Sequence, residues 1–226
     1  FGSNCMSVEL IETHISYVFL TDNVVYKMKK AVDFGFLDYS TLEKRKHYCD
    51  IEISLNRRLA PELYIGVVAI CRDSTSGDIV LGNVANNAFE VVEYAVKMHR
   101  FEQASILTQW MQSQSPLVRE SQFSLLGSCV AEFHLSTPKL VTRSNSALGK
   151  EESVRFAVEQ NFQQVSRLIN EASDKKCLKR LSDWSEGELR RHSSLFERRF
   201  VDGFVRECHG DLHTGNIAVI DEKPLL

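Results

Sequence analysis

Short runs of β-branched, aromatic and aliphatic residues dominate the first hundred positions of the chain. Such runs, bounded by turn residues, predict strands. They occupy residues 8–12, 15–20, 24–29, 64–71, 78–81 and 89–98. Residues 21–23 suit a tight turn, and residues 76–77 and 83–87 separate the later strands. The pattern predicts a five- or six-stranded antiparallel sheet.

One helix is predicted between the third and fourth strands. Ser40 and Glu43 have the spacing of a capping box, with serine at the N-cap and glutamate three residues later. The helix is expected to continue to about Leu59, because Pro61 stops it.

The same helix carries a carboxylate inside its apolar stripe. At 100° per residue, Glu52 falls on one side of the helix with Tyr48, Leu55 and Leu59. A charge on an apolar face is costly to bury without a partner. The pattern therefore predicts that Glu52 faces inward.

From about residue 105 the spacing of apolar residues becomes helical. Helices are predicted over residues 106–114, 117–135, 151–172 and 177–200, and residues 136–149 are the expected mobile loop. Two short strands follow at residues 217–220 and 224–226. The chain thus reads as α+β, with a sheet-rich lobe over residues 1–100 and a mostly helical lobe over residues 101–226.

Composition narrows the class of protein only a little. The chain has 226 residues and a formal charge of −3, which does not indicate nucleic-acid binding. Its six cysteines show no CxxC pair, so they are expected to be reduced. No apolar run reaches the length of a membrane span and no basic and apolar leader is present, so a cytoplasmic protein is expected.

The sharpest chemical signal is the segment CHGDLHTGN at residues 208–216. Asp211 precedes Asn216 by five residues, which is the spacing of the catalytic loop of protein kinases. In that arrangement the aspartate accepts the proton of the substrate hydroxyl and the asparagine oxygen binds magnesium. The segment predicts phosphoryl transfer from ATP.

Simpler interpretations of this segment compete with the catalytic one. His209 and His213 are expected to be a buried scaffold of the loop rather than acids or bases. A zinc site formed by them and Cys208 is disfavoured, because Gly210 and Gly215 argue against the helix that such spacing needs.

The loop HGDLHTGN resembles that of the aminoglycoside phosphotransferase and choline kinase branch of the protein-kinase-like fold. The segments ETHISYVFL, VVYKMKKAVDFGFLDYSTLEKR, LNRRLAPELY and VVEYAVKMHRF extend the resemblance over nearly the whole chain. They are similar to a bacterial group that is often fused to a C-terminal P-loop ATPase. The resemblance implies an ATP- and Mg²⁺-dependent kinase with a small-molecule hydroxyl acceptor, and no nucleic-acid or membrane partner.

The resemblance also implies a lysine on the third strand that pairs with a glutamate on the helix. Lys27 and Glu52 fit these roles, and Lys29 is the rival for the phosphate contact because it lies on the same strand face.

Two further nucleotide contacts follow from the resemblance. No glycine-rich loop is present, so the polar stretch around Thr13 and Ser16 is expected to face the phosphates. Met98 and His99 are expected to form the hinge at which backbone groups meet adenine.

One part of the kinase site is missing from the predicted set. The fold needs a second metal-binding aspartate, and Asp221 follows Asn216 too closely to serve. The chain is therefore expected to be truncated, with that aspartate beyond Leu226, and to be a feeble enzyme alone. The alternative is a nucleotide-binding or regulatory module with kinase architecture; a protein kinase is disfavoured by the absent glycine-rich loop.

Overall fold

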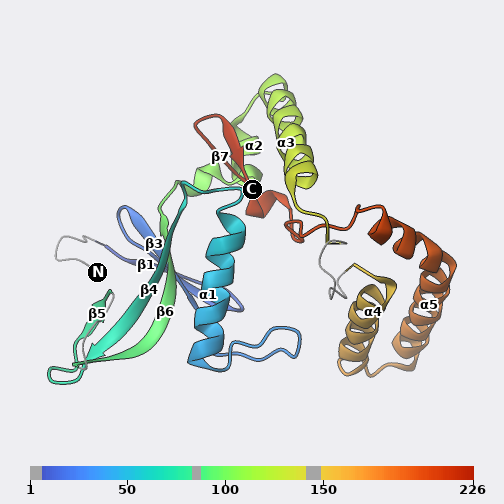
Figure 1. The fold of residues 1–226 in the computed structure, drawn as a ribbon, viewed down its shortest axis with the longest axis horizontal. Coiled ribbons are helices and arrows are strands. Elements are labelled where there is room, and N and C mark those ends of the chain that lie inside the picture. Colours follow the sequence, from blue (N-terminus) through green and yellow to red (C-terminus); the bar gives the residue numbers. More distant parts are fainter. Residues whose placement is uncertain (1–6, 83–87, 141–148) are drawn as a thin grey trace. The chain divides into compact units, whose positions relative to one another are not determined.

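The computed structural model describes residues 7–82, 88–140 and 149–226. Six strands form one antiparallel sheet in the order β1-β2-β3-β6-β4-β5 (Figure 1). The strands are β1 (Glu9–Glu12), β2 (Ser16–Leu20), β3 (Val24–Lys29), β4 (Tyr64–Asp73), β5 (Ile79–Leu81) and β6 (Phe89–His99). The predicted antiparallel sheet is confirmed, and the predicted separator at residues 83–87 lies outside the described residues.

The β2–β3 hairpin fixes the register of the strand that carries the two lysines. The backbone amide and the hydroxyl of Thr21 both donate to the carbonyl oxygen of Val24, at 2.9 and 2.8 Å. This turn places Val18 opposite Lys27 and Ser16 opposite Lys29. Because side chains alternate along a strand, both lysines lie on one face of the sheet.

Helix α1 (Leu42–Asn56) begins one residue later than the capping-box prediction. Its N-cap is Thr41, whose hydroxyl oxygen accepts the Lys44 amide at 3.3 Å. Ser40, the predicted N-cap, instead donates its hydroxyl to Asp38 at 2.6 Å. The prediction was wrong because the aspartate two residues earlier competes for the serine hydroxyl.

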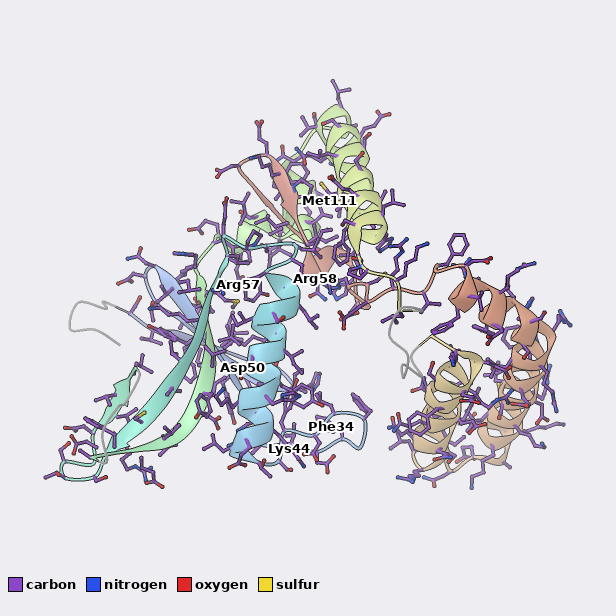
Figure 2. All side chains as sticks on the ribbon, in the orientation of Figure 1. Phe34, Lys44, Asp50, Arg57, Arg58 and Met111 are labelled. Atoms are coloured by element: carbon purple, nitrogen blue, oxygen red, sulfur yellow. The ribbon has the colours of Figure 1, made fainter. Side chains whose placement is uncertain are left out.

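The predicted end of α1 near Leu59 was also wrong. Arg57 is the C-cap, and the amides of Leu59 and Ala60 both donate to the carbonyl oxygen of Asn56. A tight turn therefore closes the helix before Pro61 is reached. Figure 2 shows Lys44 near one end of α1, Asp50 further along it, and Arg57 and Arg58 toward the other end.

The face of α1 that packs on the sheet is more polar than the predicted apolar stripe. Arg45 and Cys49 are its buried residues, and Glu52 has a side-chain exposure of 12%. Leu55, expected in the stripe, is 36% exposed. Glu52 does face inward as predicted, but its neighbours on that face are Arg45 and Cys49 rather than leucines.

The rest of the chain is mainly helical and ends in a hairpin. Its elements are η1 (Gln103–Ser105), α2 (Leu107–Ser113), α3 (Pro116–Ser136), α4 (Glu151–Ser166), α5 (Ala172–Val201), η3 (Thr214–Asn216), β7 (Ala218–Ile220) and β8 (Lys223–Leu225). Helix α4 ends at Ser166 rather than residue 172, because the amides of Arg167 and Leu168 turn back to the preceding turn of helix. Helix α5 correspondingly begins at Ala172 rather than residue 177. Of the predicted mobile loop at residues 136–149, residues 141–148 lie outside the described residues.

Two compact units make up the chain, one over residues 1–126 with 212–226 and the other over residues 127–211. The first holds the sheet, α1, α2 and the β7–β8 hairpin, with a small core of Leu107, Ile217 and Val219. The second holds α4 and α5, which lie side by side (Figure 1) and are joined by the ion pair of Arg155 on α4 with Glu186 on α5. The lobe boundary at residue 100 stays a prediction. Among the described residues, no helix is long and apolar enough to cross a membrane.

Candidate functional site

Two lysines of β3 and one glutamate of α1 form a partly buried charged cluster in the first unit. Lys27 Nζ lies 2.9 Å from Glu52 Oε1, and Lys29 Nζ lies 2.7 Å from Glu52 Oε2. The side chain of Lys29 is 4% exposed, whereas that of Lys27 is 33% exposed. The expected ion pair between Lys27 and Glu52 is present, and Lys29 binds the second oxygen of the same carboxylate.

The protonation of this cluster follows from its mutual charges. Burial acts to raise the pKa of Glu52, but the two lysines outweigh it and hold that pKa below its ordinary value. Burial acts to lower the pKa of Lys29, but the charge and hydrogen bond of Glu52 outweigh it, so that pKa is raised. The glutamate is therefore ionised and Lys29 is cationic at neutral pH.

The buried side chain of Arg45 anchors α1 to the sheet. Its Nε donates to Glu93 on β6 at 2.8 Å, and its Nη1 donates to the carbonyl oxygens of Tyr39 and Ser40 at 3.0 and 3.3 Å. Lys29 Nζ lies 4.9 Å from the centre of the Tyr39 ring. The loop before α1, the helix and the sheet are thus tied together beside Glu52.

The β1–β2 turn holds the expected phosphate-facing residues in a closed hydrogen-bond pattern. The hydroxyl oxygen of Thr13 accepts the amides of Ile15 and Ser16 at 3.4 and 2.9 Å, and the Thr13 amide donates to the Ser16 carbonyl. Ser16 is only 1% exposed, and its hydroxyl has no hydrogen-bond partner among the described residues. In this arrangement the Ser16 hydroxyl does not face an open site, contrary to the expectation.

The expected hinge residues, Met98 and His99, lie at the end of β6. Met98 is paired with Val25 of β3, and the His99 amide donates to the carbonyl oxygen of Leu63 at 2.9 Å. The Arg100 amide donates to the Asn23 carbonyl at 3.0 Å. The His99 amide is thus already hydrogen-bonded to Leu63. A role of this segment in adenine binding stays a prediction.

The segment that leads to Asp211 is held inside the second unit. Lys139 and Arg206 form an isolated bridge, and the Arg206 guanidinium donates to the carbonyl oxygens of Leu135 and Thr137. Gly210 then adopts a φ of +80°, which a side chain would disfavour. His209 Nδ1 accepts the Asp211 amide at 3.3 Å. His209 supports the loop, as expected, but it is half-buried rather than buried, and Asp211 is exposed.

Asn216 closes the short helix η3 in the first unit. His213 caps η3, since its Nδ1 accepts the Gly215 amide at 3.1 Å, and its carbonyl oxygen accepts the Asn216 amide at 2.9 Å. His213 is exposed rather than buried, which corrects the expectation for that residue. The buried Ile217 follows at once, and its carbonyl oxygen accepts the amide of Leu107 at 2.8 Å. Asn216 is thus an exposed amide fixed at the edge of a small apolar core.

Asp221 lies in the turn between β7 and β8. It and Glu222 have positive φ angles of 48° and 62°, and both are exposed. This agrees with its interpretation as a turn residue. Asn216 offers one neutral oxygen, a ligand that magnesium accepts but that does not make a site alone. Within the described residues no three His, Cys, Asp or Glu side chains gather in a metal-binding group.

No family model matches the chain. Uncharacterized proteins of Mycobacterium bovis and Mycobacterium tuberculosis are 23% identical over 219 residues, or 97% of the chain. The chain spans 40% of the length of these relatives.

A solved structure, the GDP and kanamycin complex of APH(2'')-IIIa, matches with a TM-score of 0.52 over 98% of the chain. The sequence identity is 14%, and 65% of that protein is covered. The chain has the protein-kinase-like fold. The predicted α+β fold class is confirmed, and at this identity the match speaks for the fold alone.

Sequence reasoning missed part of the charged cluster. Lys29 was weighed only as a rival of Lys27, not as a simultaneous partner of Glu52. The role of Tyr39 beneath Lys29 and the buried pair of Arg45 with Glu93 were not foreseen. One signal was available, because Arg45 precedes Glu52 by seven residues, or about two helical turns, so the two share a face.

Proposed function

We propose that this chain is the nucleotide-binding and catalytic-loop part of an ATP-dependent phosphotransferase that acts on a hydroxyl of a small molecule. The observation that carries the proposal is the ion pair of Lys27 on β3 with Glu52 on α1, at 2.9 Å. In kinases a strand lysine paired with a helix glutamate holds the nucleotide phosphates. The same chain carries the HGDLHTGN loop, and its fold is that of an aminoglycoside kinase.

The proposed roles follow the chemistry of phosphoryl transfer. The acceptor oxygen bonds to the γ-phosphorus, the bond to the bridging oxygen breaks, and its electron pair leaves on ADP. Asp211 receives the hydroxyl proton, and Lys27 offsets charge on the α- and β-phosphates. Asn216 would be one ligand of a magnesium ion, whose contribution when bound is to neutralise phosphate charge.

The acceptor is proposed only as a class. The solved neighbour holds GDP and kanamycin, a nucleotide with a polyhydroxylated amino sugar. Hydroxyl-bearing amino sugars and amino alcohols are therefore the first acceptors to test, with ATP and GTP compared as donors. No particular acceptor follows from residues of this chain.

The test separates nucleotide binding from turnover. Asp211→Asn should lower turnover by roughly a hundredfold or more, the range of general-base catalysis, while the Kd for Mg·ATP changes little. Asp221→Asn is the matched control, since asparagine tolerates a positive φ, and it should leave turnover unchanged. Equal losses of turnover and affinity in Asp211→Asn would contradict the proposed role. These measurements use the full-length protein, in which wild-type nucleotide binding without turnover would instead favour a regulatory module.

A further inference from the structure

The two lysines on β3 differ in their surroundings although both bind Glu52. Lys29 is enclosed at 4% exposure, with its ammonium over the Tyr39 ring, whereas one third of the Lys27 side chain remains open. A cation that is fully enclosed cannot reach a ligand without leaving its partners. The open lysine can reach one by moving only its own side chain.

The charges of the cluster do not cancel. Two ammonium groups face one carboxylate, so one positive charge is left over. The neutral neighbours do not compensate it: burial raises the pKa of the Tyr39 phenol, and burial raises the pKa of the Cys49 thiol to about 11. Both ammonium groups contact the same carboxylate, that of Glu52, so the cluster carries one surplus positive charge.

We infer that Lys29 is a positioning residue, which neutralises Glu52 from the buried side so that the charge of Lys27 is available to an anionic ligand. The inference rests on the proposed function, because it assumes that the anion is the polyphosphate of a nucleotide. With a single lysine, the glutamate and the phosphates would compete for one cation. With two, Glu52 keeps an ion pair while Lys27 turns to the phosphates.

Lys29 also holds α1 against the sheet. Lys29 lies 2.7 Å from Glu52 Oε2, and that contact does not involve Lys27. The helix therefore stays bound to β3 whether or not Lys27 is engaged with a ligand. Lys29 acts on the ligand only through Glu52 and Lys27, and it does not itself touch the nucleotide.

Binding of Mg·ADP to the 226-residue chain, measured by calorimetry, tests the inference. Lys27→Met should raise the Kd by about a hundredfold, because the cation that pairs directly with the polyphosphate is lost. Lys29→Met should raise the Kd by about tenfold, because Lys27 is then neutralised by Glu52. Lys30→Met is the matched control: Lys30 follows in sequence but pairs with the exposed Glu12, at 2.6 Å, and its substitution should leave the Kd unchanged.

The double variant Lys29→Met with Glu52→Gln gives a result that a merely structural role cannot produce. Without the carboxylate, Lys27 regains its surplus charge, so the Kd should recover to within about threefold of wild type. An unchanged Kd in Lys29→Met, or no recovery in the double variant, would overturn the inference. If wild type binds no nucleotide at all, the proposed function fails, and this inference with it.

Wild-type labelling keeps the inference testable if Lys29→Met does not fold. An ATP analogue with an acyl group on its terminal phosphate reacts when a lysine amine attacks the acyl carbonyl, forming an amide and releasing ATP. Peptide mass spectrometry should find the amide on Lys27, with excess ATP preventing its formation. An amide on Lys29 would overturn the assignment, and no amide on either lysine would count against the nucleotide site itself.

Discussion

Arg45→Met is expected to be the most destabilising single change on α1 that leaves the Lys27 and Glu52 pair intact. The guanidinium makes one charged hydrogen bond to Glu93 at 2.8 Å and two to backbone carbonyl oxygens. Both ionic side chains are largely enclosed, with exposures of 10% and 17%. Removal leaves Glu93 with one remaining hydrogen bond among those described, from the Tyr94 amide at 2.9 Å.

The magnitude follows from these contacts. A hydrogen bond to a charged group contributes about 1.5 to 3 kcal/mol, and breaking a buried ion pair from one side costs about 3 to 5 kcal/mol. Methionine restores part of the lost packing volume, so we expect the free energy of unfolding of the first unit to fall by about 3 kcal/mol.

Urea unfolding followed by tryptophan fluorescence measures this loss. Trp110 packs against the core of the first unit, while Trp184 lies on α5 and is 65% exposed, so a Trp184→Phe background isolates the signal of Trp110. Lys46→Met is the control, because its ion pair with Asp50 is exposed, and it should change the free energy by less than about 0.5 kcal/mol. A loss in Arg45→Met no larger than that of the control would refute the reasoning.

Three other expectations concern the cap, the cluster and a tight contact. Thr41→Ala should lower the free energy of unfolding by about 1 kcal/mol and Ser40→Ala by less, in urea titrations, since Thr41 is the N-cap. The pKa of Glu52 is lower in the folded state than its ordinary 4.5, so the stability that Glu52 contributes is complete above about pH 4.5 and is lost as pH falls through the folded value. In thermal melts from pH 3 to 6, Glu52→Gln should therefore reduce the fall of the melting temperature at acidic pH. Gly149→Ala should lower the melting temperature, because φ is +78° and the new Cβ would lie 2.0 Å from a methyl carbon of Val205; an unchanged melting temperature would contradict the contact.

The sequence predicted the elements of the first unit well because its strands have strong local signals. Alternating apolar residues and the turn at residues 21–23 set the hairpin, and the register then brought both lysines to one face. Helix ends were less predictable. Ser40 lost the N-cap to Thr41 because Asp38 competes for its hydroxyl, a contact that depends on the folded loop.

The sequence predicted individual residues of the candidate site, but not that Glu52 binds two lysines at once. The spacing of the loop identified Asp211 and Asn216, and the helical pattern placed Glu52 inward. The resemblance implied Lys27 and its ion pair with Glu52, which is present in the structure. That one carboxylate binds two lysines depends on the distance between helix and strand, which no local pattern specifies. The burial of Ser16 likewise depends on what covers the sheet rather than on the residue itself.

The polar inner face of α1 has a consequence for how that helix responds to heat. Where Arg45, Glu52 and Asn56 leave the sheet, the groups that become hydrated are charges and amides rather than hydrocarbon. Hydration of polar surface lowers the heat capacity, whereas hydration of apolar surface raises it. Local detachment of α1 should therefore have a small heat-capacity change, and its free energy should vary with temperature along a nearly straight line rather than a dome.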